Sequence, residues 1–239
     1  MRKRALITGA SRGIGAETAR ALAGDGYDLV LVCRRSINRL EELKKELEGT
    51  YDICCQTVLC DVSDAGQVET MIKQAGEIHV LVNNAAISYV GLLTDMSIQQ
   101  WHDVMDTNLN ALFYTCRLVI PQMVQRKAGR IINVSSVWGN VGASMEVAYS
   151  TAKGGVNSFT KALAKELAPS GIQVNGVAFG VIDTDMNACF TREEMESLRE
   201  EIPADRIGSA REAGEMIRQM LYLPDYLTGQ MIAMDGGWI

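Results

Sequence analysis

The stretch "ALITGASRGIG", residues 5–15, decides the fold of this chain. Its first four residues form a short, unbroken, mainly apolar run, and Gly9, Gly13 and Gly15 follow at GxxxGxG spacing. Glycine lets the backbone turn tightly and lets a helix pack closely on the preceding strand. The stretch therefore predicts a buried strand, a tight turn and the start of a helix whose N-terminal N–H groups are free.

The same alternation of strand and helix continues along the whole chain. Helices are expected at 14–23, 37–49, from about 63, 98–126, around Tyr149 and at 210–221. Further strand-like runs are "DLVLVC" (28–33), "ICCQTVLC" (53–60), "IHVLV" (78–82), "RIINV" (130–134), "IQVNGVAFG" (172–180) and "GQMIAM" (229–234). Short runs rich in Val, Ile and Leu suit parallel strands that are buried on both faces. We predict one α/β domain over residues 1–239: a doubly wound parallel sheet (Rossmann fold) of about seven strands with helices on both faces.

Composition excludes several classes of protein. The 239 residues carry a net charge of −6, which opposes nucleic acid as the main partner, because phosphate binding needs a basic surface. The apolar run near the N-terminus is too short for a signal peptide, and no run reaches the length of a membrane helix, so we expect a cytoplasmic protein with no membrane partner. Six cysteines without a CxxC pair indicate buried thiols rather than disulfides or a metal site. They are Cys33, Cys54, Cys55, Cys60, Cys116 and Cys189.

The glycine turn and the end of the second predicted strand indicate a dinucleotide site. A helix N-terminus that faces free N–H groups towards a ligand favours a pyrophosphate. An acid usually ends the second strand and holds the ribose hydroxyls, but this chain has "CRRS" there. Arg34 and Arg35, with Arg12 from the turn, suit a 2′-phosphate, which favours NADP(H) over NAD(H). The alternative is a tight turn without ligand and a solvated charge pair at a helix start.

"YSTAKGG", Tyr149 to Gly155, places a phenol and an ammonium on one helix face, because residues four apart are neighbours there. A nearby cation is expected to lower the pKa of Tyr149 towards neutral pH. The small residues around Tyr149 and Lys153 leave room for cofactor and substrate. Taken alone, the pair is equally compatible with an ordinary surface helix.

The order and spacing of several motifs resemble the short-chain dehydrogenase/reductase family over essentially the full length. The motifs are "TGASRGIG", "CDV" (60–62), "NNAA" (83–86), Asn108, Ser136, "YSTAK" (149–153) and "DGG" (235–237). The resemblance implies that Tyr149 protonates a carbonyl oxygen as hydride arrives, and that Ser136 hydrogen-bonds to that oxygen. It implies that Lys153 holds the nicotinamide ribose, and that Asn108 distorts its helix and holds a water in a proton relay. Ser135 is the less favoured neighbour of Ser136 by spacing.

The resemblance also assigns a cofactor site. Asp61 and Val62 match adenine contacts, Asn83 and Ala85 match a loop beside the adenosine ribose, and Ile182 and Thr184 match the carboxamide segment. The full cofactor set is Gly9, Ser11, Arg12, Gly13, Ile14, Gly15, Arg34, Arg35, Asp61, Val62, Asn83, Ala85, Tyr149, Lys153, Gly180, Ile182 and Thr184. Two positions depart from the family pattern. Ala86 stands for a glycine, and Phe179 stands for a proline, where its ring could reshape the nicotinamide pocket or fill part of the acyl site.

Within the family, the chain most resembles 3-oxoacyl-(acyl carrier protein) reductases of fatty acid synthesis, through "GASRGIG", "TDM" (184–186) and "MDGGWI" (234–239). That implies a keto substrate, free or carrier-bound, a lid at about 186–208, and a homotetramer or homodimer. The helices at 98–126 and around Tyr149, and the strand near 231–234, would form its contacts. Arg126, Lys127 and Arg130 are a candidate surface for acyl carrier protein, or simply a solvated helix end. A reductase or dehydrogenase of another ketone or secondary alcohol, and a catalytically idle nucleotide-binding scaffold, remain alternatives.

Overall fold

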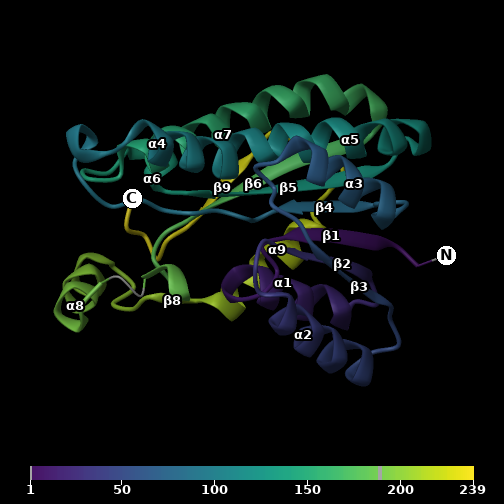
Figure 1. Cartoon of the computed structure of the whole chain (residues 1–239), viewed down its shortest axis with the longest axis horizontal. Coiled ribbons are helices and arrows are strands. Elements are labelled where there is room, and N and C mark those ends of the chain that lie inside the picture. Colours follow the sequence, from purple (N-terminus) through teal and green to yellow (C-terminus); the bar gives the residue numbers. More distant parts are fainter. Residues whose placement is uncertain (1, 188–189) are drawn as a thin grey trace.

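Seven parallel strands form one sheet in the order β3-β2-β1-β4-β5-β6-β9 (Figure 1). We describe residues 2–187 and 190–239 of a computed structural model. The strands are β1 Arg4–Thr8, β2 Asp28–Cys33, β3 Cys55–Leu59, β4 Val80–Asn83, β5 Gly129–Ser136, β6 Ile172–Phe179 and β9 Met231–Met234. After β3 the chain crosses back to lie beside β1, so the strand order reverses between β1 and β4. A reversal of this kind opens a crevice at the carboxyl ends of the strands. The predicted doubly wound sheet is confirmed.

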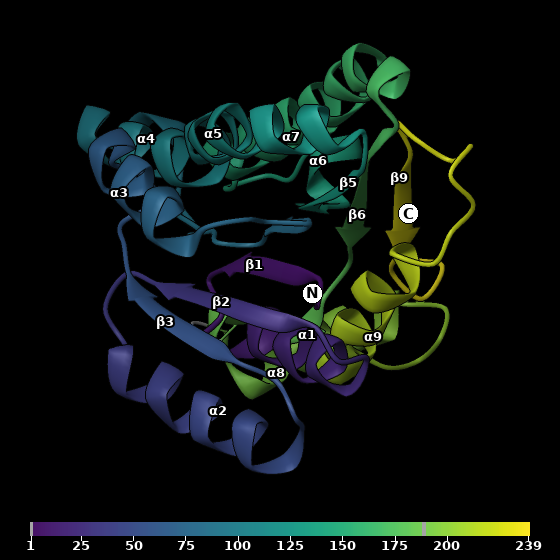
Figure 2. The same cartoon turned by 90° about the vertical axis from the view of Figure 1, so that its right-hand side faces the viewer.

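Helices cover both faces of the sheet (Figure 2). One layer contains α1 Gly13–Gly24, α2 Ile37–Thr50 and α9 Ala210–Met220. The other contains α3 Ala65–Ala75, α4 Ile98–Met105, α5 Ala111–Arg126 and α7 Val147–Leu167. Short elements complete the fold: η1 Leu93–Asp95, α6 Trp138–Val141 and η3 Ala168–Ser170.

Two hydrophobic clusters hold these layers to the sheet, because successive side chains of a strand point to opposite faces. In β1, Ile7 packs with Leu22 of α1 in one cluster, whereas Leu6 packs with Met123 of α5 in the other. All four side chains are fully buried. Each contributes about 1.5–3 kcal/mol relative to an exposed position.

The helix expected over 98–126 is interrupted. A π-helical turn, η2 Asp106–Asn110, separates α4 from α5. Within this turn Asn108 is 1% exposed, and its side chain makes two hydrogen bonds with the backbone of Ile87. The helical region expected over 98–126 is confirmed with those bounds. The distortion around Asn108 that the family resemblance implied is present within it. Single π turns are frequent at functional sites.

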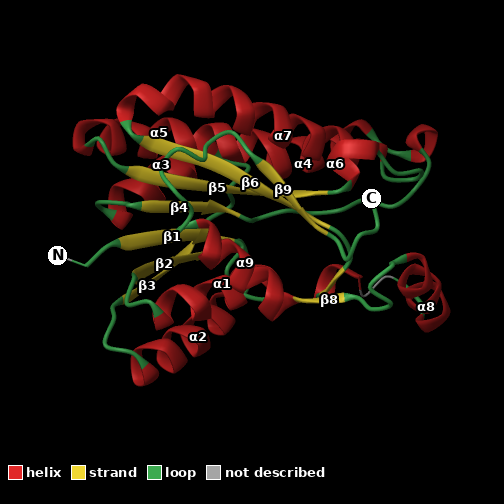
Figure 3. Ribbon diagram, turned by 180° about the vertical axis from the view of Figure 1, so that it is seen from behind, coloured by secondary structure: helices red, strands yellow, loops and turns green. Residues whose placement is uncertain are grey.

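The predicted lid corresponds to an insertion between two short strands. β7 Ile182–Asp183 pairs in parallel with β8 Gly208–Ser209, and η4 Asp185–Asn187 and α8 Arg192–Glu201 lie between them. A capping box formed by Thr191 and Glu194 begins α8. Figure 3 shows α8 standing away from the layers beside the carboxyl edge of the sheet. Part of this segment, including Cys189, lies outside the described residues.

Candidate active site

A cleft of about 810 Å³ opens at the carboxyl ends of the central strands. Its lining comes from the glycine turn, the loops after β2, β3, β4 and β5, α7, and the segment after β6. Many ligand pockets have a volume in this range. The cleft therefore occupies the crevice that the reversal of strand order creates.

The glycine turn forms one wall of the cleft and has no room for side chains. Gly9 has φ +67°, and a Cβ there would lie 2.9 Å from the Ala85 Cα. A Cβ on Gly15 would lie 2.3 Å from the carbonyl oxygen of Gly9. Arg12 precedes α1 without making a side-chain cap, so the first N–H groups of the helix remain available to a ligand. This cradle fits the pyrophosphate of a dinucleotide.

Asn84 holds the turn against the loop after β4. Its side-chain Nδ2 donates to the carbonyl oxygens of Thr8 (3.0 Å) and Gly9 (3.2 Å). The neighbouring Asn83 instead lies behind the wall, where it donates to Asn133 Oδ1 at 2.9 Å. Sequence reasoning selected Asn83 and overlooked Asn84. The signal for Asn84 was its position immediately after a buried strand, where a loop meets the site.

Arginines and acids face one another at the end of the cleft beside the glycine turn and the carboxyl ends of β2 and β3. Arg34 pairs with Asp61 at 2.7 Å, and Asp61 also accepts a hydrogen bond from the Ser63 hydroxyl at 2.7 Å. Asp185 of η4 lies 3.6 Å from Arg12 and 3.3 Å from Arg39 of α2. The remaining predicted lining residues of this half are present in the cleft wall: Ser11, Gly13, Ile14, Arg35, Val62 and Ala85.

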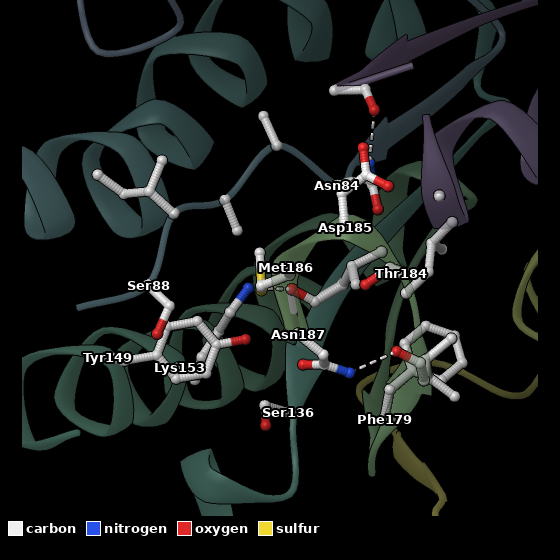
Figure 4. Close-up of a pocket in the computed structure, with 18 of the residues that line it drawn as sticks. Asn84, Ser88, Ser136, Tyr149, Lys153, Phe179, Thr184, Asp185, Met186 and Asn187 are labelled. Atoms are coloured by element: carbon white, nitrogen blue, oxygen red, sulfur yellow. Dashed lines mark hydrogen bonds between the residues drawn. The ribbon is translucent and has the colours of Figure 1, made fainter. Parts of the chain in front are cut away.

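Tyr149, Lys153 and Ser136 converge in the other half of the cleft, from α7 and the end of β5 (Figure 4). Lys153 Nζ donates to the Val134 carbonyl at 2.9 Å and lies 5.5 Å from the centre of the Tyr149 ring. The two serines have separate partners. The Ser135 hydroxyl donates to Asn157 Oδ1 at 2.6 Å, whereas Ser136 Oγ, the favoured candidate, accepts from the Trp138 N–H at 3.2 Å.

Burial governs the protonation of this pair. It raises the pKa of Tyr149, the charge of Glu146 raises it further, and a hydrogen bond with Ser136 opposes the shift. Burial also lowers the pKa of Lys153 to about 8. The pKa of Tyr149 is therefore shifted in the opposite direction to the expected one, because desolvation and the charge of Glu146 both disfavour the phenolate. Tyr149 is therefore a protonated phenol at neutral pH. The pKa of Lys153, about 8, lies close to neutral pH.

The segment after β6 closes the half of the cleft that holds Tyr149 and Lys153. Gly180, Ile182 and Thr184 line the cleft, as the resemblance implied. Phe179 is 3% exposed and packs with Ile182 in the hydrophobic cluster of the α1 layer. The ring therefore anchors the end of β6 in the core while it forms part of the cleft wall.

The comparisons with known proteins agree with this geometry. Residues 3–195 match the family model described as short chain dehydrogenase. The chain belongs to the short-chain dehydrogenase family. It is 39% identical over 242 residues to an uncharacterized oxidoreductase, YmfI, of Bacillus subtilis, covering 100% of this chain and 99% of the relative.

Other short-chain dehydrogenases match at similar levels. A 3-oxoacyl-[acyl-carrier-protein] reductase, FabG, of Staphylococcus aureus is 39% identical over 242 residues, covering 99% of this chain and 98% of the relative. A crystal structure of a short-chain type dehydrogenase/reductase from Mycobacterium marinum superposes with a TM-score of 0.91 at 33% identity, covering 99% and 95% of the two chains. The family uses a nicotinamide nucleotide, so this dehydrogenase is an oxidoreductase with such a cofactor.

The basic cluster that is a candidate surface for a carrier protein lies at the opposite end of the sheet from the cleft. Arg130 starts β5, whereas Ser136 ends it, which separates them by about 20 Å along the strand. Arg126 pairs with Glu77 at 2.9 Å and Arg130 with Asp225 at 2.8 Å, so both guanidinium groups serve local structure. Lys127 ends α5 in the left-handed region, at φ 53°. Docking of a carrier protein on this cluster stays a prediction.

Several lining residues were not anticipated, and three of them are Glu146, Trp138 and Trp238. The rings of Trp138 and Trp238 contact edge to face with centres 4.9 Å apart. Within residues 2–187 and 190–239, no cluster of three or more His, Cys, Asp or Glu side chains could hold a metal ion. Among the same residues, no helix is long and apolar enough to cross a membrane.

Proposed function

We propose that this short-chain dehydrogenase uses NADP(H) to reduce a ketone to a secondary alcohol. The observation that carries the proposal is the convergence of Tyr149, Lys153 and Ser136 opposite an uncapped helix N-terminus in one cleft. A phenol, a serine hydroxyl and a site for a nicotinamide nucleotide are the parts that carbonyl reduction needs. The intact set also argues against a catalytically idle scaffold.

The protein groups handle the carbonyl oxygen. When bound, the reduced cofactor supplies the hydride that reaches the carbonyl carbon. The Tyr149 hydroxyl donates its proton to the oxygen, and the Ser136 hydroxyl hydrogen-bonds to the same atom. Because its pKa is raised, Tyr149 is protonated at neutral pH, which suits the direction of reduction. Lys153, with a pKa of about 8, can hold or release a proton near the pH at which the enzyme works.

The charge pattern supports NADP(H). Arg12, Arg34 and Arg35 line the adenosine end, and Arg39 lies beside them through its contact with Asp185. A guanidinium binds phosphate through charge-assisted hydrogen bonds, and an acid at the end of β2, which would favour a free ribose, is replaced by arginine. The arginines that pair with Asp61 and Asp185 would then bind the 2′-phosphate as well.

The relatives suggest a first substrate to test. The Staphylococcus aureus relative is named a 3-oxoacyl-[acyl-carrier-protein] reductase, so a 3-oxoacyl thioester, free or carrier-bound, is the leading candidate. Reduction of another ketone, or oxidation of a secondary alcohol, is the alternative, because substrate choice in a shared fold depends on the residues around the site.

A substrate panel tests the proposal. Oxidation of NADPH and of NADH is followed with 3-oxoacyl thioesters, simple ketones and steroid ketones under one set of conditions. We expect turnover with at least one ketone class, and with NADPH in preference to NADH. Absence of turnover with every ketone and both cofactors would contradict carbonyl reduction, and a preference for NADH would contradict the cofactor assignment alone.

A further inference from the structure

Glu146 is a titratable group of the cleft that the proposed reaction does not use. It lies three residues before Tyr149, at the start of α7, and it lines the same cleft. Its recorded side-chain contact is the Ser88 hydroxyl at 3.5 Å. The other cleft acids, Asp61 and Asp185, face arginines. Glu146 has no cationic side chain within ion-pair distance in the part of the chain that is described.

The loop that positions Glu146 is held firmly in place. Met145 adopts a left-handed conformation with φ 63°, which costs energy for a residue with a side chain. Its carbonyl accepts the Gly91 N–H at 2.8 Å, and the Ala143 N–H donates to Ser150 Oγ at 3.0 Å. These contacts join the loop to α7 and to the segment after β4. The position of Glu146 is therefore a fixed part of the cleft.

A carboxylate in this setting favours a positively charged ligand. Burial raises the pKa of Glu146, because the charged form loses hydration and gains only one weak hydrogen bond. The Glu146 side chain is partly buried, and acids that are shielded from water are normally paired. A cation carried by the ligand would supply the missing partner and offset the cost of burying the charge.

Aromatic rings in the same cleft suit the same ligand. Trp138 begins α6, the helix that leads into the Glu146 loop, and packs against Trp238. Both line the cleft together with the apolar Met145 and Val90. Aromatic faces attract ammonium groups, and quaternary ammonium ligands are recognised in this way. The cleft that the Glu146 carboxylate lines therefore also offers aromatic and apolar surface to an alkylammonium group.

We propose that Glu146 selects ketone substrates that carry a positively charged nitrogen a few bonds from the reacting carbonyl. The inference deepens the proposed function, since it rests on carbonyl reduction at Tyr149. Neutral ketones and neutral thioesters would enter the same cleft without this attraction. Substrates with a carboxylate at that distance would be repelled.

Three methyl ketones with the same three-methylene stem test the selection. One ends in trimethylammonium, one in the neutral, isosteric tert-butyl group and one in carboxylate. We expect kcat/KM to fall in that order, with about tenfold between the cation and the neutral ketone. In Glu146→Gln, the ratio of kcat/KM for the cation to kcat/KM for the neutral ketone should fall from about tenfold to about one. The ratio cancels any effect that the loss of the Glu146 charge has on Tyr149, because both ketones react with the same tyrosine. Glu42→Gln, an exposed acid on α2 outside the cleft, is the matched control.

Calorimetric binding of the trimethylammonium ketone separates this inference from the reaction. If no ketone is reduced but Glu146→Gln weakens binding about tenfold, the selection holds and carbonyl reduction fails. Reduction of all three ketones with equal efficiency by the parent enzyme would overturn the selection. It would also be overturned if the Gln variant kept the full preference for the cation. If Glu146→Gln does not fold, the ranking of kcat/KM for the cationic, neutral and anionic ketones is compared between the parent and Glu146→Asp. A ranking in the parent that does not favour the cation would overturn the selection.

Discussion

At the scale of single residues, desolvation competes with charge in the cleft. Tyr149 is half-buried beside an acid, and its pKa is raised; Lys153 is 2% exposed, and its pKa falls to about 8. The sequence placed the two side chains on one helix face correctly. The sign of the shift at Tyr149 could not be read from spacing, because it depends on the solvent that the surrounding walls exclude.

Tyr149→Phe should remove most turnover and leave cofactor binding intact, because the ring still packs while the proton donor is lost. A donor of this kind contributes about 10²–10⁴-fold to the rate. The measurement is kcat with one ketone, together with the Kd for NADPH. Tyr226→Phe, at a fully exposed ring, is the control and should behave as the parent. Turnover of Tyr149→Phe within a few-fold of the parent would exclude Tyr149 as the acid.

Arg34→Asp should reverse the cofactor preference. The carboxylate would repel a 2′-phosphate and accept hydrogen bonds from a free ribose, and it would also lie against Asp61. One charge-assisted contact of about 1.5–3 kcal/mol corresponds to roughly ten- to a hundredfold in preference. The ratio of kcat/KM for NADPH and NADH measures the change, with Lys45→Asp on α2 as the control. Added salt should narrow the preference of the parent, because the contact is partly exposed.

Lys153→Met should stabilise the protein at pH 7 while it abolishes turnover. Below about pH 8 the native state holds a desolvated ammonium, which costs stability. Between about pH 8 and pH 10.5, Lys153 is protonated in the unfolded chain but not in the native state. The free energy of unfolding of the parent therefore rises with pH over this range. The variant lacks this dependence. After allowance for the lost bond to Val134, its advantage should be about 1–2 kcal/mol at pH 7.

Urea unfolding of parent and variant at pH 7 and pH 10 measures that advantage, which should shrink at the higher pH. Lys161→Met, at an exposed site on the same helix, should show little difference at either pH. An advantage of Lys153→Met that is constant across the pH range would mean that desolvation of the lysine is not its cause.

At the scale of elements, the π turn η2 is a feature that the local hydrophobic pattern of the sequence does not predict. The apolar pattern over 98–126 is helical throughout, so periodicity predicts one helix. The interruption arises because Asn108 bonds to a loop that follows β4, which is a tertiary contact between distant segments. The strands of the main sheet, its doubly wound class and the glycine turn could be predicted, since they depend on patterns within the sequence. The π turn, the placement of Asn84 and the Glu146 loop depend on partners that the sequence does not identify.

Asn108→Ala should destabilise the protein by about 2–4 kcal/mol, because the Ile87 N–H and carbonyl, which are partly buried, would both lose their partners. Asn110→Ala in the same turn removes one partly buried hydrogen bond, to Asp106, and should cost about 1 kcal/mol. Urea unfolding at neutral pH compares the two variants. Equal losses would show that the bonds to Ile87 do not anchor the turn.

At the scale of the whole molecule, two surfaces remain open for assembly. The outer face of α5 exposes Phe113 (51%) and Val124 (39%), three helical turns apart on one side. β9 forms one edge of the sheet, and its strand is only half-buried. Edge strands in stable proteins are usually covered. These surfaces fit the contacts expected of a homotetramer or homodimer, which stays a prediction.

Phe113→Glu should shift the assembly to a smaller species, because a charge would enter an apolar contact between copies of α5. The parent is expected to have the mass of a tetramer, or at least a dimer, by light scattering at micromolar concentration. Leu59→Glu, at an exposed apolar site on the opposite edge strand β3, should leave the mass unchanged. A monomeric parent would contradict the predicted assembly, and an unchanged mass for Phe113→Glu would exclude this face of α5.

The tryptophan pair gives the protein a built-in optical reporter. Of the three tryptophans, Trp138 and Trp238 line the cleft, whereas Trp101 packs in a small cluster between α4 and α7. Reduced nicotinamide absorbs light where tryptophan emits, so a cofactor that enters the cleft quenches the fluorescence of two of the three rings. Occupancy can then be followed without a label. Trp101→Phe would remove the emission of the third ring, so that the remaining tryptophan fluorescence comes only from the two rings that line the cleft.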